Sequence, residues 1–440
     1  MIEIPVHRPR EAPIARKAGT GGRRWRIAWL LALGVLISNL DRVNISVAQQ
    51  ALHLAFGLTT VSFGFLLGAY SWTYAMLQLP SGVLIDRLGL RRVGVVSSFV
   101  WSMATFATAS AVGPVSLFSS RLLLGVGEAP MFPMNAKAVG HWFPEKARGL
   151  PTSMFDAAAK FSPAVGIPFV GLLLIHFGWR ISFALTGVVS MLYFLLFACV
   201  YRNPADDRAL SPGERAYIES DCGLSESAGD PSSYTLGYLL LQRKILGLTI
   251  GFGTYNYSFY LLLTWLPSYA AAGLHLSPVH AVWAASIPWF FAGVIDLAVG
   301  GWLVDALIRR GHPAGRVRRT VLLLGMACGV GIAGPALTHH AIPALIALSI
   351  GLGGLSAAAP VSWSLPSILV PTSSTGRVGG IMNFGSQLAA ISAPVITGYL
   401  TSWTHTFAAA FALAAIFLVI GNISYACLLG KIERIPAPLA

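Results

Sequence analysis

The chain has 440 residues, of which 55% are hydrophobic and only 11% are Asp, Glu, Lys or Arg. An ordinary soluble domain has about 25% charged residues, so this composition excludes a soluble enzyme. The apolar residues fall in runs of about 20, long enough for helices that cross a bilayer, whereas a membrane β-barrel would show alternating segments of about ten residues. The sequence therefore predicts an all-α, polytopic membrane protein.

The expected helical spans follow in chain order. The first half, 25–201, is predicted to hold six spans: 25–48, 60–85, 92–112, 115–137, 150–175 and 180–201. A polar, acidic stretch at 202–242 then forms a central loop. The second half, 243–430, is predicted to hold six more spans: 243–270, 279–306, 318–338, 342–365, 377–400 and 406–429. A basic tail, 1–24, and a short tail, 431–440, flank the two halves.

The net charge of +13 indicates orientation rather than nucleic-acid binding. Outside the spans, every Lys and Arg except Arg180 lies in the tails or in loops on the same side as the tails. Because cytoplasmic loops are enriched in Lys and Arg, both termini are predicted to be cytoplasmic, where anionic lipid headgroups attract them. Asn-x-Ser sequences occur only inside spans, which favours a bacterial cytoplasmic membrane over an animal one. We expect a monomer.

The two halves repeat a short pattern. Residues 82–92 read GVLIDRLGLRR and residues 300–311 read GGWLVDALIRRG, each at a predicted cytoplasmic turn. Parallel repeats with a site between them at mid-membrane are typical of transporters. The four cysteines are isolated and no phosphate-binding loop occurs, so we expect no metal, no cofactor and no enzymatic activity.

Longer motifs resemble one family. They are residues 39–48 (NLDRVNISVA), 74–80 (YAMLQLP), 121–130 (RLLLGVGEAP) and 256–267 (NYSFYLLLTWLP). Together with residues 82–92 they are similar to the major facilitator superfamily and, within it, to the anion:cation symporters. That family includes bacterial galactonate, hexuronate and glucarate carriers and the animal sialin-like carriers. The resemblance covers about residues 25–430 and implies a fold of twelve helices in two halves.

Charges inside spans are candidate site residues, because a charge in the hydrocarbon is costly unless it is paired or hydrated. Span one holds Asp41 and Arg42, and span four holds Arg121 and Glu128 on one helix face with Gly125 between them. Two acid–base pairs across this interface are predicted, serving either transport or structure alone. An arginine can hold a carboxylate through two parallel hydrogen bonds, and a buried carboxylate can load and unload a proton.

The resemblance implies a role for each of these groups. Arg42 would contact the substrate carboxylate and Glu128 would carry the coupling proton, with Asp41 and Arg121 as the partner pair. Three polar residues, Tyr74, Asn383 and Ser364, match or lie near substrate-contacting positions of the family.

The remaining charges are open to several interpretations. Lys160, one helical turn after Asp156, either pairs with it or lies near a second carboxylate of a diacid substrate. Asp296 in span eight is either involved in transport or pairs locally. A gating group at the cytoplasmic turns is predicted to cap helices and to pair across a closed gate: Asp86, Arg87, Arg91, Asp305 and Arg309.

The combined prediction is a carrier that imports a small organic anion with protons by alternating access. A drug/proton exporter would share the fold, but its cavity should be apolar, which Arg42, Arg121 and Lys160 argue against. A membrane sensor would need a soluble signalling domain, for which the central loop of about 40 residues is too short.

Overall fold

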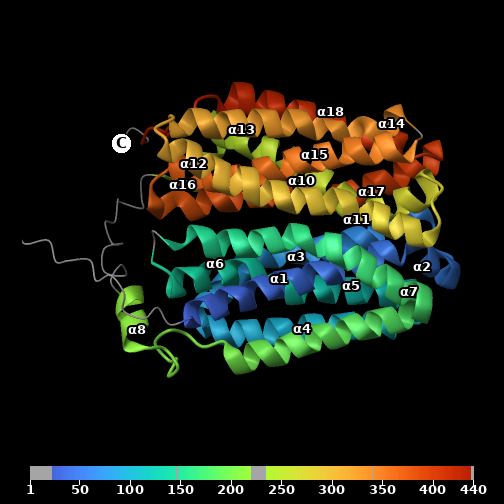
Figure 1. Cartoon of the computed structure of the whole chain (residues 1–440), viewed down its shortest axis with the longest axis horizontal. Coiled ribbons are helices and arrows are strands. Elements are labelled where there is room, and N and C mark those ends of the chain that lie inside the picture. The colour runs from blue at the N-terminus through green and yellow to red at the C-terminus, as the bar shows by residue number, and fades with distance from the viewer. Residues whose placement is uncertain (1–21, 145–146, 220–233, 339, 438–440) are drawn as a thin grey trace, which may run out of the picture.

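The computed structural model describes residues 22–144, 147–219, 234–338 and 340–437, and no strand occurs among them. Two bundles of near-parallel helices lie side by side, one built from the first half of the chain and one from the second (Figure 1). Helix α2 lies at one end of the bundles and α8 at the other; these are called the α2 end and the α8 end below.

The described part of the first bundle is built from α1 Arg23–Val47, α2 Gln49–Phe56, α3 Thr60–Leu88, α4 Leu90–Ala109, α5 Pro114–Glu128, α6 Met131–Trp142 and α7 Gly149–Val200. Helix α7 has 52 residues, about 78 Å of helix, which is far more than one crossing needs. Gly178 lies inside it with φ 75°, in the left-handed region that glycine adopts readily. This bend separates the two arms of α7, which correspond to expected spans five and six.

The second bundle is built from helices with several breaks. They are α10 Arg243–Ser268 with η2 Tyr269–Gly273, α11 Pro278–Ile295, η3 Asp296–Leu303, α12 Val304–Arg309, α13 Ala314–Gly329, η4 Val330–Ala333, α14 Gly334–Leu337, α15 Ala341–Ser364, α16 Pro366–Leu369, α17 Thr372–Thr404, α18 Ala408–Ser424 and η5 Tyr425–Leu429. Helix therefore occupies every range in which a span was predicted. The break between α5 and α6 at Pro130 was not predicted.

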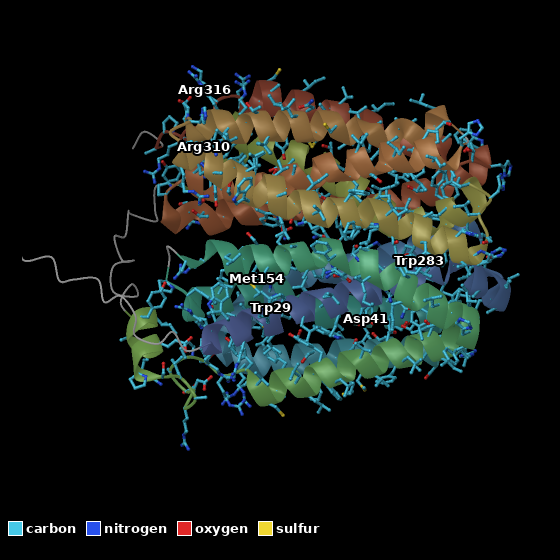
Figure 2. All side chains as sticks on the ribbon, in the orientation of Figure 1. Trp29, Asp41, Met154, Trp283, Arg310 and Arg316 are labelled. Carbon is cyan, nitrogen blue, oxygen red and sulfur yellow. The ribbon has the colours of Figure 1, made fainter. Side chains whose placement is uncertain are left out.

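The helices have the character of membrane spans. Within the described residues, six helical segments are long and apolar enough to cross a membrane, with α7 counted as one segment. The bent pair α2–α3 makes a seventh if it is counted as one span. In Figure 2, Asp41 lies between helices at mid-length, whereas Arg310 and Arg316 lie at the α8 end. The chain is thus a helical membrane protein, as predicted.

The short helices α8 Pro212–Glu219 and α9 Leu236–Leu240 lie in the expected central loop. Arg23 Nε is 2.8 Å from Asp207 Oδ2, and the backbone N–H of Arg24 donates to Glu214 Oε1 at 3.0 Å. These contacts hold the described part of the loop against the start of α1. Residues 1–21 of the expected basic tail and residues 220–233 of the loop lie outside the described residues.

The two bundles meet along two seams, α3 against α17 and α7 against α11. Glycines permit close approach near the α2 end: a Cβ on Gly64 would lie 2.7 Å from the backbone oxygen of Pro394, and one on Gly171 would lie 2.4 Å from Val282 Cγ2. Towards the α8 end, Cβ atoms on Gly82 and Gly379 would have no neighbour within 4 Å. The α3/α17 seam is therefore tight near the α2 end and open near the α8 end.

Candidate transport site

A buried ion pair joins α1 to α5 in the first bundle. Arg42 Nε donates to Glu128 Oε2 at 2.8 Å, and the two side chains are 8% and 0% exposed. Gly125 lets α5 approach α3, since a Cβ there would lie 2.3 Å from the backbone oxygen of Tyr70. One of the two ion pairs predicted between spans one and four is therefore present.

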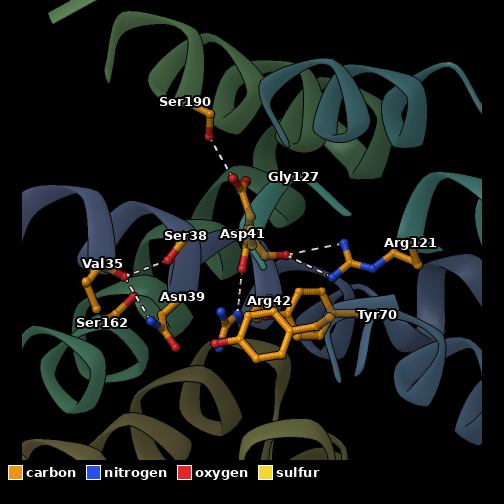
Figure 3. A network of polar contacts seen from close by, with 12 residues as sticks. Val35, Ser38, Asn39, Asp41, Arg42, Tyr70, Arg121, Gly127, Ser162 and Ser190 are labelled. Atoms are coloured by element: carbon orange, nitrogen blue, oxygen red, sulfur yellow. Dashed lines mark hydrogen bonds and ion pairs between the residues drawn. The ribbon is translucent and has the colours of Figure 1, made fainter. Parts of the chain in front are cut away.

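The prediction of a second ion pair, between the Asp41 and Arg121 side chains, is wrong for this conformation, because the two side chains do not form it. Arg121 donates from Nη1 and Nη2 to the backbone oxygen of Asp41, at 3.4 and 3.3 Å. The Asp41 carboxylate turns instead towards the second arm of α7, where its Oδ2 accepts from Ser190 Oγ at 2.7 Å (Figure 3). Asp41 Oδ1 is buried and has no hydrogen-bond partner within the described chain.

Two tyrosines, one helical turn apart on α3, lie against the guanidinium group of Arg42. Its Cζ atom is 4.6 Å from the ring centroid of Tyr70 and 5.1 Å from that of Tyr74, within cation–π range. Tyr74 was predicted as a site residue, whereas Tyr70 was missed, although their spacing of four residues places both on one face.

The site continues across the seam into the second bundle. Gln78 Nε2 donates to the Tyr74 hydroxyl at 3.4 Å, and Asn383 Nδ2 donates to Gln78 Oε1. Asn383 is therefore connected to the predicted site, as expected, through an amide that sequence analysis did not select. Ser364 is not connected to it: its hydroxyl donates to the Val361 backbone oxygen of its own helix at 2.7 Å.

A small cavity lies beside Arg42, between α1, α3, α5 and α10. It is lined by Arg42, Ile45, Leu67, Tyr70, Arg121, Tyr260, Leu263 and Thr264. Its volume of about 10 Å³ holds one water molecule at most, so a larger solute needs the bundles to move apart. Sequence analysis selected neither Tyr260 nor Thr264 as a site residue.

Three charged atoms around this cavity are buried without a hydrogen-bond partner among the described residues: Arg42 Nη2, Arg121 Nε and Glu128 Oε1. Buried polar groups are normally satisfied, so unsatisfied donors at a cavity are candidates for binding an anion. The two guanidinium groups offer such donors, and the adjacent carboxylate offers an acceptor for a proton.

Lys160 lies in a separate cluster. Its Nζ is 2.6 Å from Asp156 Oδ2 on the same helix and 3.7 Å from Asp296 Oδ1 of the second bundle. The expected pair with Asp156 is therefore present, and the contact with Asp296 across the seam was not predicted. Two carboxylates more than neutralise Lys160, so in this conformation it is not an unpaired cation for a second substrate carboxylate.

The residues of the predicted gate are spread over one end of the molecule. Asp86 Oδ1 is 2.5 Å from Lys137 Nζ in the same bundle, and Arg91 donates to the backbone oxygens of Tyr201 at 3.1 Å and Ala198 at 3.0 Å. No ion pair of Arg87, Asp305 or Arg309 is found among the described residues. Pairing across a gate stays a prediction for a conformation in which the α8 ends meet.

Two helical bundles with a buried polar site between them are an arrangement typical of membrane carriers. Residues 31–394 match the model of the Major Facilitator Superfamily, and the chain belongs to this superfamily. It is therefore a multi-pass membrane transporter, not an enzyme.

Two relatives and one solved structure extend this result. The chain is 37% identical to the transporter YybO of Bacillus subtilis, covering 94% of this chain and 96% of the relative. It is 29% identical to a D-galactonate transporter of Escherichia coli, covering 99% and 100%. A bacterial homologue of the human lysosomal transporter Spinster, solved inward-facing and unoccupied, superposes with a TM-score of 0.73 at 17% identity, covering 95% and 100%.

Proposed function

We propose that the protein imports a small organic anion, a sugar acid or related carboxylate, together with protons by alternating access. The observation that carries the proposal is the buried Arg42–Glu128 pair, in which Arg42 lines the cavity between the bundles. Arg42 Nη2 and Glu128 Oε1 have no hydrogen-bond partner among the described residues. The similarity to a D-galactonate transporter supports this substrate class.

The pair suggests how one guanidinium couples two ligands. While Glu128 is ionised, it occupies Arg42 Nε at 2.8 Å and neutralises the arginine. Protonation of Glu128 removes that negative charge, and Arg42 can then offer two parallel N–H groups to a substrate carboxylate. Binding of the proton and binding of the anion therefore favour each other. Asp41, with its unpartnered Oδ1, is the second proposed carrier of a coupling proton.

The other site residues have supporting roles in this proposal. Arg121 adds positive charge beside the cavity, and Tyr74 orients Arg42. The hydrogen bond between Gln78 and Asn383 of α17 links the site to the second bundle. Both termini are proposed to be cytoplasmic, from the distribution of Lys and Arg, so the α8 end faces the cytoplasm.

The direct test is uptake by proteoliposomes containing the full chain, with an imposed pH gradient and a panel of aldonates, uronates, aldarates and aromatic acids. We expect at least one sugar acid to accumulate when the outside is acidic. Uptake of no acid in the panel, or proton-driven movement of amphiphilic compounds instead, would overturn the proposal in favour of the exporter.

Glu128→Gln separates coupling from binding. The amide keeps the size of the side chain but cannot lose a proton, so we expect exchange of radiolabelled anion across the membrane without accumulation against a gradient. Accumulation at the wild-type level would reject Glu128 as the coupling group.

Arg42→Lys tests the substrate contact. Lysine keeps the charge but not the two parallel N–H groups, and hydrogen bonds to charged groups contribute about 1.5–3 kcal/mol, so affinity should fall about 10- to 150-fold. Calorimetric binding of the transported acid measures it. Arg180→Lys, at an exposed arginine that donates to the Ala111 backbone oxygen, is the matched control and should bind normally. Unchanged affinity in Arg42→Lys would make Arg42 structural.

A further inference from the structure

A second cluster of charged groups is buried across the α7/α11 seam. Asp156 and Lys160 belong to α7, and Asp296 is the first residue of η3. The side chains of Lys160 and Asp296 are 4% and 3% exposed, and that of Asp156 is 19% exposed. Two carboxylates against one ammonium leave one negative charge without compensation.

The geometry shows which carboxylate lacks its partner. Asp156 Oδ2 accepts from Lys160 at 2.6 Å, whereas Asp296 Oδ1 is 3.7 Å from the same nitrogen, too far for a hydrogen bond. Asp296 Oδ1 has no other hydrogen-bond partner within the described residues. An uncompensated buried charge is costly, and a carboxylate in that position lowers the cost by taking up a proton.

The described elements that pack around Asp296 offer no alternative counter-ion. Helix α15, which packs against η3, has no charged residue, and the only titratable residue of α11 is His280, at its far end. On α12, Asp305 and Arg309 follow beyond η3, towards the loop. A further titratable group near the cluster, Tyr255 of α10, is a phenol and carries no positive charge.

We propose that Asp156, Lys160 and Asp296 form a second proton-binding site, with the proton on Asp296, and that its occupancy controls the contact between the two bundles. The proposal adds a coupling site to the proposed function and rests on it only in taking the proton as the coupling ion. Within the described chain, Lys160–Asp296 is the ion pair that joins the bundles, so protonation of Asp296 weakens a contact across the seam.

The backbone at Asp296 supports a functional role. Residues Asp296–Leu303 form a π-helical segment between two α-helices, a deviation that is frequent at functional sites. On the α2 side of the cluster, a Cβ on Gly293 would lie 2.9 Å from Phe161 of α7. On the α8 side, Leu150 of α7 is 61% exposed. The cluster thus lies where the tightly packed part of this seam gives way to exposed residues.

The test measures the distance between the bundles without any substrate. Spin labels are placed at Leu54 on α2 and Leu337 on α14, which are 77% and 84% exposed, in a full-length chain lacking the native cysteines. The distance is followed between about pH 5 and pH 9. In the wild-type chain we expect one protonation transition that belongs to Asp296 and one that belongs to Glu128, with the α2 ends moving apart in acid.

Three substitutions assign the transitions. Asp296→Asn should abolish one transition and populate the longer distance at high pH, and Glu128→Gln should abolish the other. Asp156→Asn should move the Asp296 transition about one to three pH units lower, because removing a neighbouring negative charge favours the ionised form. Glu433→Gln, an exposed acid of the C-terminal tail, is the control and should change neither transition.

The outcomes are decisive in each direction. If Asp296→Asn keeps both transitions, the cluster is a structural ion pair and the proposal falls. Should Asp296→Asn fail to fold, an unmoved transition in Asp156→Asn leads to the same conclusion. A distance change that follows sodium at constant pH, and that Asp296→Asn removes, would replace the proton by a metal cation. None of these results depends on sugar-acid uptake, so the proposed function stands or falls separately.

Discussion

The two seams both hold the bundles together, but one does so through neutral contacts and the other through charged groups. At the α3/α17 seam, backbone meets backbone at Gly64 and Pro394, and the polar contact nearer the α8 end is between two neutral amides, Gln78 and Asn383. At the α7/α11 seam, the corresponding contact is the ion pair between Lys160 and Asp296.

This difference implies that pH acts on one seam and not on the other. Amide side chains do not titrate, so the hydrogen bond between Gln78 and Asn383 is the same in acid and in base. An ion pair lasts only while its carboxylate is ionised, so it weakens as the pH falls. With the proposed proton site, the contact at the α3/α17 seam would persist at any pH, whereas the contact at the α7/α11 seam would depend on proton binding.

Among the substitutions that test this difference between the seams, Lys160→Met should cause the largest loss of stability. It leaves Asp156 and Asp296 as buried carboxylates without a cation, and breaking a buried pair in this way costs about 3–5 kcal/mol of stability. Thermal unfolding of the detergent-purified chain at neutral pH measures the loss. Neutralising all three positions, with Asp156→Asn and Asp296→Asn added, should restore most of it. A single variant as stable as the wild type would show that the ion pairs contribute little.

Gly64→Ala tests the α3/α17 seam, whose contacts are uncharged, and its energetic cost should be smaller than that of Lys160→Met. Its Cβ would lie 2.7 Å from the Pro394 backbone oxygen, so α3 and α17 must move apart near the α2 end. Overpacking costs about 1–3 kcal/mol, which shifts the equilibrium between closed and open α2 ends about 5- to 150-fold. The Leu54–Leu337 label distance should lengthen at all pH values. Gly82→Ala, where nothing lies within 4 Å, is the matched control; equal effects of the two changes would contradict this account.

The sequence was sufficient for the features that depend on local pattern. The apolar runs predicted the helical ranges, and the rule that buried charges are paired predicted that Arg42 would meet an acid from span four. The family pattern pointed to Tyr74 and Asn383. The structure brings both to the same site, because α3 and α17 form one seam.

Sequence analysis failed where the rotation of a distant helix decides the contact. Asp41 faces Ser190, 149 positions away on the second arm of α7, and nothing near either residue in the sequence indicates that arm's rotation. The same limit hid the link between Lys160 and Asp296 and the position of Tyr260 beside Arg42. The predicted gate pairing does not occur among the described residues and stays a prediction for a conformation with closed α8 ends.

The experiment with the smallest expected effect tests the difference between the two seams most specifically. Gln78→Ala, Asn383→Ala and their double variant form a double-mutant cycle for the neutral contact. A neutral hydrogen bond contributes about 0.5–1.5 kcal/mol, and since neither group titrates, the coupling energy should be equal at about pH 5 and pH 8. The matching cycle of Lys160→Met and Asp296→Asn should give a coupling energy that is larger at pH 8 and declines in acid, because Asp296 must be ionised to attract Lys160. Unfolding of the purified variants at both pH values measures the two cycles together. If the amide contact weakened in acid as much as the ion pair does, pH would be acting on the whole interface, and the two seams would not differ in the way proposed.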